Sequence, residues 1–420
     1  MYRPNTGVSF ARRLRRDRGA VLIHVAVALL GLTAFSVLVI DYGVMWTARN
    51  QAQNAADAGA LAAALSLAFY DADDIPRAKA AAVAAGQANL VWGQAPNINP
   101  AVDVIIPYAC PLGAPGPPDT CVRVNVYRNA VKDPLPVYFG RLVGIENQGV
   151  QAMAVAQILM ANASDCIKPF AVPDRWIERR DDKGVPRIIP WDWEQTFDRY
   201  YETGPDKGTL LSLDPNAVDE YVPPSGEDPG SGFRLPDDYG EPVVLKAGNP
   251  ARSINPGWYF PVDLPRLGGE PLTGGDRFRE NIANCNGVAV GPGDVLTVEP
   301  GVMIGPTAQG IRDLVAPDPS HWDESADAPV CESLDPNCFT RRYVAIPMFD
   351  VNAYALADRT TGRFDLPITR LVGFFIEDIP DSGPHKNDVI GYFVPFRGMF
   401  REEGPAPQPS SFLRTVALVR

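Results

Sequence analysis

An uncharged apolar run near the N-terminus constrains this chain more than any other feature. Residues 19–40 (GAVLIHVAVALLGLTAFSVLVI) carry no charge, and their polar side chains are His24, Thr33 and Ser36. A helix through them would be roughly 33 Å long at about 1.5 Å per residue, which is enough for one bilayer crossing. The run therefore predicts a transmembrane helix. The residues assigned to this anchor include Gly19, His24, Gly31 and Ile40.

The flanks of the run predict its orientation. Six arginines precede it (Arg3, Arg12, Arg13, Arg15, Arg16 and Arg18), whereas the first residue after it is Asp41. The positive-inside rule then makes residues 1–18 a cytoplasmic tail and puts residues 41–420 outside the cytoplasmic (inner) membrane, as a single-pass protein of the periplasmic side. A cleaved secretory signal is the alternative. The apolar core is longer than the roughly 7–15 residues of such signals, and no A-x-A site closes it before Asp41.

The residues after the run predict a continued helix with a small-residue face. Residues 41–70 contain no proline and are rich in Ala and Leu, so the helix should extend to Tyr70. Alanine recurs at every fourth position, which places these residues in one column on the helix surface. The column consists of Ala48, Ala52, Ala56, Ala60, Ala64 and Ala68. It packs either against the chain's own domain or against another copy or a partner protein.

The sequence on both sides of the membrane exit resembles a known module. The basic flank, the single apolar span, the Asp-Tyr-Gly exit and the run QNAADAGALA at residues 53–62 are similar to the N-terminal module of TadE/TadG-like proteins, over residues 16–68. These proteins belong to the bacterial tight-adherence (Flp pilus) machinery. The motif residues are Asp41, Gly43, Arg49, Gln53, Asn54, Ala55, Ala56, Asp57 and Ala58. The resemblance implies a membrane-anchored structural component that contacts other pilus-assembly proteins.

Two departures limit what the resemblance implies. Pseudopilins of this machinery carry a Gly before the cleavage point and a Glu five residues later, but here Gly19 is followed by His24 at the matching position. Cleavage by a prepilin peptidase is therefore not expected. Larger TadG-like members often carry a von Willebrand A domain with an Asp-x-Ser-x-Ser metal motif, which this sequence lacks. We accordingly predict no metal and no cofactor.

Six cysteines predict disulfide bonds, because an even number in an oxidising compartment is typical of a disulfide framework. Six cysteines allow 15 connectivities. The spacing favours Cys110–Cys121 and Cys331–Cys338, which leaves Cys166–Cys285. A zinc site is the alternative, but there is no CxxC, and His321 and His385 lie far from any plausible ligand pattern.

The rest of the region 41–163 predicts a small, pilin-like α/β fold. Residues 77–90 are rich in alanine and should form a second helix, whose start is marked by Pro76 and by acidic residues (Asp71, Asp73 and Asp74). Calcium binding by these aspartates is the alternative, but the Gly turn and distal Glu of a calcium loop are missing. Strands are expected at 102–106, 121–127 and 150–160, and a short helix at 136–143.

Residues 164–420 predict a separate β-rich, Pro/Gly-rich domain, so the whole chain is expected to be α+β. Short apolar runs separated by Pro/Gly turns favour a sandwich or barrel. The expected strands are 243–247, 258–262, 288–290, 295–298, 343–349, 368–376, 389–395 and 412–419. The Gly/Pro-rich segment 291–307 is interpreted as turns.

Charge and motifs argue against nucleic acid as a partner and against catalysis. The net charge is −12, and no G-x-S-x-G, H-E-x-x-H or P-loop motif is present. Adjacent carboxylates (Asp181/Asp182, Asp237/Asp238, Glu402/Glu403) should point apart in extended chain and so form solvated acidic surface. We predict a non-enzymatic assembly protein. The alternatives are an anchored adhesin or glycan-binding protein and, less favoured, a cell-wall hydrolase using carboxylates that folding brings together.

Overall fold

The structure is a computed structural model that forms two compact units. Unit 1 comprises Met1–Ser66, Asp74–Gln157 and Ala417–Arg420, and unit 2 comprises Leu67–Asp73 and Ile158–Val416. The structure describes residues 13–69, 74–181, 184–187, 189–193, 195–202, 204–226, 228–249, 254–265, 274–331 and 337–419. Most of the basic tail, together with Tyr70, Asp71, Asp73 and Asp182, lies outside the described residues. The predicted α+β class is confirmed.

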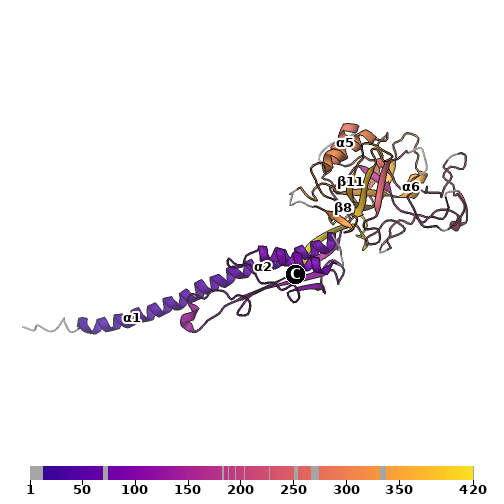
Figure 1. Cartoon of the computed structure of the whole chain (residues 1–420). Helices are drawn as coiled ribbons and strands as arrows, with labels where there is room; N and C mark the ends of the chain where they lie inside the picture. Colours follow the sequence, from indigo (N-terminus) through magenta and orange to yellow (C-terminus); the bar gives the residue numbers. More distant parts are fainter. Residues whose placement is uncertain are drawn as a thin grey trace, which may run out of the picture. The chain divides into compact units, whose positions relative to one another are not determined.

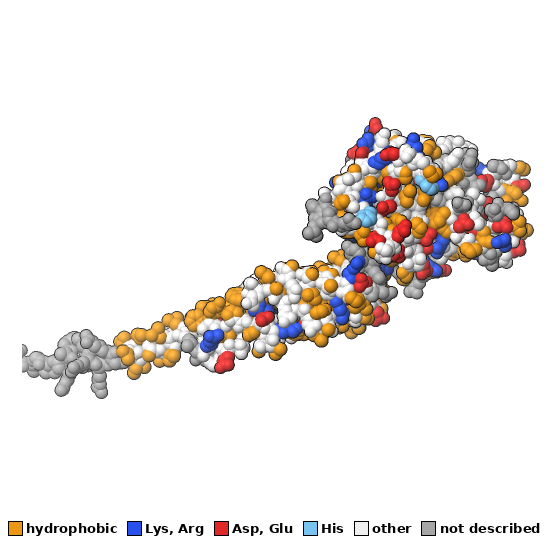
Figure 2. Space-filling view, in the orientation of Figure 1, with side chains coloured by type: hydrophobic (Ala, Val, Ile, Leu, Met, Phe, Trp, Pro, Cys, Tyr) orange, Lys and Arg blue, Asp and Glu red, His pale blue; other side chains and the backbone are white. Residues whose placement is uncertain are grey.

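Unit 1 contains most of a continuous rod made of α1 (Arg13–Ser36), the π-helical turn η1 (Val37–Asp41) and α2 (Tyr42–Phe69), whose residues from Leu67 on belong to unit 2 (Figure 1). The apolar side chains of α1 are exposed on all sides, for example Leu22 at 73% and Leu30 at 72% (Figure 2). A helix that is apolar all round needs an apolar environment. Within the described part of the chain, one helix is long and apolar enough to cross a membrane.

The alanine column of α2 is buried inside the chain. Ala48, Ala52, Ala56, Ala60 and Ala64 are each 0% exposed, and Ala68 is 1% exposed. The facing helix α3 (Ile75–Ala88) contributes its own buried small residues at fourfold spacing, Ala78, Ala82 and Gly86. A Cβ added at Gly59 would lie 3.0 Å from the Ala82 carbonyl oxygen and 3.2 Å from Val124 Cγ1. Small residues therefore let α2 approach both α3 and the sheet. This agrees with the alternative in which the column packs against the chain's own domain.

The sheet of unit 1 contains β1 (Val104–Tyr108), β2 (Cys121–Arg128) and β3 (Val150–Met160), paired antiparallel in this order. Alternate residues of β2 (Val122, Val124 and Val126) are fully buried, as the period of two predicts. Helix α3 starts as expected, because the Asp74 carboxylate caps the Arg77 backbone N–H at 2.9 Å and Pro76 lies in the first turn.

The helix predicted at 136–143 is mostly wrong. It is reduced to the 3₁₀ turn η2 (Gly140–Val143). The backbone N–H groups of Tyr138, Phe139 and Gly140 bond to the Asp41 carboxylate instead of to carbonyls of a helix. A contact almost a hundred residues away in sequence thus overrides the local preference.

Unit 2 is built on a sheet with the strand order β10-β4-β6-β5-β12-β11-β7. An additional pairing between β10 and β11 closes most of this sheet into a barrel-like ring, as the sequence suggested. The strands are β4 (Phe170–Pro173), β5 (Pro242–Ala247), β6 (Trp258–Pro261), β7 (Val295–Thr297), β10 (Tyr343–Phe349), β11 (Asp365–Asp378) and β12 (Val389–Val394).

Smaller elements surround this sheet. They are η3 (Pro215–Ala217), the hairpin β8 (His321–Asp323) and β9 (Ala328–Val330), α6 (Val351–Leu356), and the parallel pair β13 (Phe396–Arg397) and β14 (Leu413–Val419). Helices α4 (Gly275–Ala283) and α5 (Ile304–Val315) pack their apolar faces, including Ile282 and Ile311, on a core cluster with Leu245 and Ile346.

Two local predictions in unit 2 need correction. The strand expected at 288–290 is absent from the described structure, where Val290 forms an isolated bridge with Ser164. The Asn286 amide donates to the Val288 carbonyl at 2.6 Å and curls this segment. The interpretation of 291–307 as turns holds at Gly291–Asp294, but Ile304 already begins α5, because buried residues at helical spacing face the core.

Three cysteine pairs lie at bonding distance, in the connectivity that the spacing favoured. The Cα–Cα distances are 5.3 Å for Cys110–Cys121, 4.2 Å for Cys166–Cys285 and 6.1 Å for Cys331–Cys338. The first bond closes the β1–β2 loop of unit 1, and the other two lie in unit 2.

Overpacking the alanine column should destabilise unit 1. Ala60→Leu adds three carbons at a fully buried helix–sheet contact and should cost about 1–3 kcal/mol. Hydrogen exchange at the β2 amides of the full chain measures this cost. Ala80→Leu, at an exposed position of α3, is the matched control and should leave the exchange unchanged. Equal exchange in the two variants would contradict close packing of the column.

Candidate functional site

The first residue after the apolar run holds a distant turn of the same unit. The Asp41 carboxylate accepts hydrogen bonds from three consecutive backbone N–H groups: Tyr138 at 2.9 Å, Phe139 at 3.1 Å and Gly140 at 2.5 Å. Asp41 is 6% exposed. We call these four residues the Asp41 socket. Three N–H donors favour the ionised form of a carboxyl group, so the socket holds a buried, compensated charge.

A glycine is required in the socket. A Cβ added at Gly140 would lie 2.8 Å from Val137 Cγ1 and 3.1 Å from Asp41 Oδ2. Any larger residue would push the turn away from the carboxylate. The socket thus depends on one acidic and one small residue that are far apart in sequence.

Polar residues of α2 tie the helix to the rest of unit 1. The Gln53 amide donates to Asp57 Oδ1 at 2.8 Å and to the Met153 carbonyl of β3 at 2.9 Å. Gln51 accepts the Trp92 backbone N–H at 2.7 Å, beyond the end of α3. These bonds fix the rotation of α2 about its axis and its position along that axis, relative to β3 and to the segment after α3.

The predicted anchor residues lie along α1 and η1. His24 and Gly31 are exposed, and Ile40 is 42% exposed. A Cβ at Gly31 would meet nothing within 4 Å, and the same holds for Gly43. Gly19 lies in α1. Where the structure describes their side chains, these anchor positions are exposed, and the Asp41 socket lies directly beyond them.

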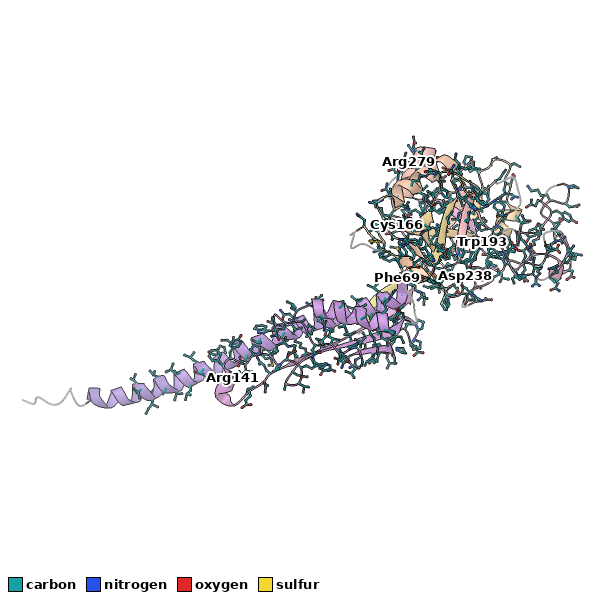
Figure 3. All side chains as sticks on the ribbon, in the orientation of Figure 1. Phe69, Arg141, Cys166, Trp193, Asp238 and Arg279 are labelled. Atoms are coloured by element: carbon teal, nitrogen blue, oxygen red, sulfur yellow. A yellow bond between two sulfur atoms is a disulfide. The ribbon has the colours of Figure 1, made fainter. Side chains whose placement is uncertain are left out.

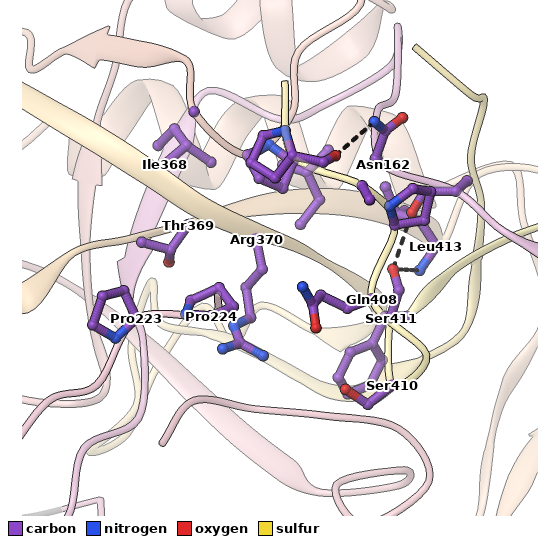
Figure 4. A pocket seen from close by; sticks show the side chains of 18 of the residues that line it. Asn162, Pro223, Pro224, Ile368, Thr369, Arg370, Gln408, Ser410, Ser411 and Leu413 are labelled. Carbon is purple, nitrogen blue, oxygen red and sulfur yellow. Dashed lines mark hydrogen bonds between the residues drawn. The ribbon is translucent and has the colours of Figure 1, made fainter. Parts of the chain in front are cut away.

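Unit 2 contains a cavity of about 380 Å³ (Figure 4). It lies among the turn Pro223–Gly226, the β11 residues Ile368–Leu371 and the segment Pro405–Leu413. Most of its lining is apolar, with several prolines. Such a lining favours a neutral, largely apolar ligand or side chain.

The polar groups of the cavity are of two kinds. The Arg370 guanidinium is fully engaged, with Asp174 Oδ2 at 2.7 Å and with the Phe233 and Pro229 carbonyls. In contrast, Gln408 Oε1 and Ser410 Oγ are buried and have no hydrogen-bond partner among the described residues. Both atoms are buried beneath the lining, so they do not face the open space of the cavity.

Folding also assembles a carboxyl cluster that sequence reasoning missed. Glu178 and Asp219 are 2% and 0% exposed. Burial first, and the neighbouring Asp219 charge second, raise the pKa of Glu178, so this carboxyl is protonated near neutral pH. Asp219 accepts backbone N–H bonds from Arg179 at 2.8 Å and Asp198 at 2.6 Å. The cluster is closed to solvent and shares hydrogen bonds within the fold.

The described members of the carboxylate pairs named from the sequence have separate partners or are exposed, and Asp182 lies outside the described residues. Asp237 is paired with Arg234, and Asp238 with Arg175 at 2.6 Å. Asp181 bonds locally to the Val185 backbone N–H, and Glu402 and Glu403 are exposed. Glu178, Asp198 and Asp219 were not predictable together, because irregular loops separate them by 20 to 41 positions. Among the described residues, no group of three or more His, Cys, Asp or Glu could hold a metal ion.

Comparison with protein families decides what unit 1 is. Residues 19–66 match the family described as "Putative Flp pilus-assembly TadE/G-like", and residues 45–156 match the family described as "Putative Tad-like Flp pilus-assembly". Residues 19–156 are a Tad-like pilus-assembly module. Comparison with curated proteins and with solved structures gave no match. The predicted resemblance is confirmed over these residues, and the match supports a Flp/Tad pilus-related component.

The Asp41 socket joins the two matched segments of the Tad module. Asp41 lies in the first match, and Tyr138 to Gly140 lie near the end of the second. Of the predicted motif residues, Ala55 and Ala56 are buried, Gln53, Asp57 and Ala58 are partly buried, and Gly43, Arg49 and Asn54 are exposed. Their roles as a family motif remain a prediction.

Removing the socket carboxylate should release the turn. Hydrogen bonds to a charged acceptor contribute about 1.5–3 kcal/mol each, so Asp41→Ala should weaken local closure by at least about 2 kcal/mol. Amide exchange at Tyr138–Gly140 should then be roughly 30-fold faster. Glu146→Ala removes an exposed carboxylate from the same region and should not change exchange. Unchanged protection in Asp41→Ala would contradict the socket.

The carboxyl cluster should make unit 2 less stable as pH rises. The folded chain keeps the Glu178 proton at pH values where the unfolded chain has lost it, because the folded pKa is raised. Stability should therefore fall between about pH 5 and pH 8. Asp198 and Asp219, whose pKa values are also raised mainly by burial, add to this trend, and Arg180 opposes it at Asp198.

Glu178→Gln tests this pH dependence. The amide is neutral, keeps an acceptor for the Trp176 indole N–H, and should flatten the fall in the unfolding temperature of unit 2. Glu402→Gln, at an exposed site, is the control and should keep the wild-type slope. The same slope in both variants would show that Glu178 is not the protonated group.

Proposed function

We propose that this chain is a non-enzymatic, single-span component of a tight-adherence (Flp/Tad-type) pilus machinery. Residues 1–18 lie in the cytoplasm, residues 19–40 cross the cytoplasmic membrane, and the rest of the chain lies outside. The protein acts through contacts with other pilus-assembly proteins. The Tad-like module at residues 19–156, directly continuous with an apolar helix, is the observation that supports this most strongly.

The proposed role is mechanical. The rod of α1 and α2 carries the anchor on one side of Asp41 and the packed Tad module on the other. Buried alanines, the Gln53 bonds and the Asp41 socket make α2 part of a rigid unit rather than a free stalk. Force on the module would therefore be transmitted to the membrane helix through well-packed backbone.

Partner contacts should use surfaces other than the alanine column. The column is 0–1% exposed in a single chain, so self-association through it would require unit 1 to open. We retain the proposal that residues 41–163 form the membrane-proximal region. Residues 164–420 then present a disulfide-linked β-rich surface to the pilus, the peptidoglycan or the exterior.

A second candidate function is an anchored adhesin or glycan-binding protein. The observation that favours it is the unit 2 cavity, with its mainly apolar lining. The hydrolase alternative has less support, because the assembled carboxyls Glu178 and Asp219 are inaccessible to a substrate.

Deleting the gene in its source cell separates these functions. The pilus-assembly role predicts that pilin is still made but that surface pili are lost, with recovery when the full chain is restored. Normal pili together with lost adhesion would overturn the assembly role and support the adhesin. Protease added to the outside of intact inner-membrane vesicles of known orientation would test the topology independently.

A further inference from the structure

Aromatic side chains are exposed directly beyond the apolar run. Tyr42 is 56% exposed and Trp46 is 59% exposed, with ring centroids 6.5 Å apart in a stacked arrangement. They lie one and five residues past Asp41, which corresponds to about 1.5 Å and 7.5 Å along the helix. Both rings therefore sit within two turns of the end of the apolar run.

The turn of the Asp41 socket brings further exposed side chains close to the end of the apolar run. Tyr138 is 56% exposed and Ile145 is 46% exposed, and the Arg141 side chain between them is also exposed. Figure 3 shows Arg141 on this turn, beside the helical rod. Because three backbone N–H groups of the turn bind Asp41, the turn is held at the last residue before the aromatic pair.

The path of the chain explains why this turn reaches so far. Strand β3 starts at Val150, in a surface depression shared with Tyr42, Met45 and Trp46. The connection between β2 and β3 runs past this sheet end, with Leu135 and Gln148 bridged, before it reaches Asp41. The turn is thus an extension of the hairpin toward the apolar helix.

We propose that Tyr42, Trp46, Tyr138 and Ile145 form a collar that docks into the interfacial layer of the lipid bilayer. Tyr and Trp rings favour this layer because one edge is apolar and the other forms hydrogen bonds. The Arg141 guanidinium is placed to bind lipid phosphate. The occupant is lipid because Tyr42 and Trp46 follow residues 19–40 directly and the hydrogen bonds to Asp41 hold the turn of Tyr138 beside them, so a spanning α1 brings the collar to the bilayer surface.

The collar deepens the proposed function and rests on it, since it requires α1 to cross the membrane. With two attachments, the helix and the turn, the Tad module cannot swing freely about a single flexible point. Its orientation relative to the bilayer is then fixed by the Asp41 socket. An oriented module presents the same face to its assembly partners in every copy.

Site-specific photo-crosslinking to lipid tests the collar. The full chain is placed in phospholipid nanodiscs, one chain per disc, with p-benzoylphenylalanine replacing one residue at a time. Ile145 probes the collar, and Leu32 probes the anchor. Leu112 is the matched negative control, because it is fully exposed in the Cys110–Cys121 loop of the same unit. This loop lies far from the collar end of the sheet. It ends at Cys121, which pairs with Gln157 of β3, and Gln157 is about 23 Å along the strand from Val150 at about 3.3 Å per residue.

The proposal predicts lipid adducts from Leu32 and Ile145 and none from Leu112. Adducts from Leu32 without adducts from Ile145 would overturn the collar and leave the anchor intact. No adducts from either site would overturn the anchor itself, and with it the proposed function. Equal adducts from Ile145 and Leu112 would show nonspecific labelling and would also overturn the collar.

Asp41→Ala in the same experiment tests how the collar is positioned. Lipid adducts from Ile145 should fall several-fold while those from Leu32 stay constant. Glu146→Ala should change neither. Unchanged adducts from Ile145 in Asp41→Ala would show that the socket does not hold the collar at the bilayer.

Discussion

The Asp41 carboxylate and its three backbone donors are the constraint on which the membrane-proximal structure depends. An acidic residue at the end of an apolar helix is costly to bury unless its charge is compensated. Tyr138, Phe139 and Gly140 provide that compensation, and in doing so they bring a turn from the far end of the module back to the helix. The membrane-exit residue and a turn near the end of the second matched segment are thereby held together.

The structure of unit 1 also requires that α2 approach its neighbours closely, and small residues make this possible. The α2 alanines, with Gly59 and Gly86, let one helix contact both a second helix and the sheet. The fourfold spacing made this face visible in the sequence, but not what it contacts, because the same column would suit a partner helix equally well. In the single chain these alanines are buried, which favours packing against the chain's own domain.

Elements set by local periodicity were predictable, and those set by distant contacts were not. Strand β3 matches its predicted bounds because Val150–Met160 is apolar except for Gln151 and Gln157, and Tyr343–Phe349, an uninterrupted apolar run, matches as well. The 136–143 helix failed because Asp41 captures its backbone donors. Helix α5 was not predicted because Gly305-Pro306 in its first turn indicated a turn. The Glu178 cluster was not predicted because it is formed by loops that have no hydrophobic periodicity. The cavity of unit 2 likewise arises from three segments far apart in sequence.

The central claim is that the chain keeps its basic N-terminal tail and its apolar helix, without cleavage, as a permanent anchor that holds the Tad module at the membrane. The intact mass of the native protein, measured after membrane fractionation, tests this most directly. The account predicts a full-length chain in the membrane fraction, six hydrogens lighter than its reduced form because of the three disulfides. A chain that begins at Ala20 would contradict it, since cleavage after Gly19 despite His24 would make the protein a processed component that leaves the membrane with the pilus.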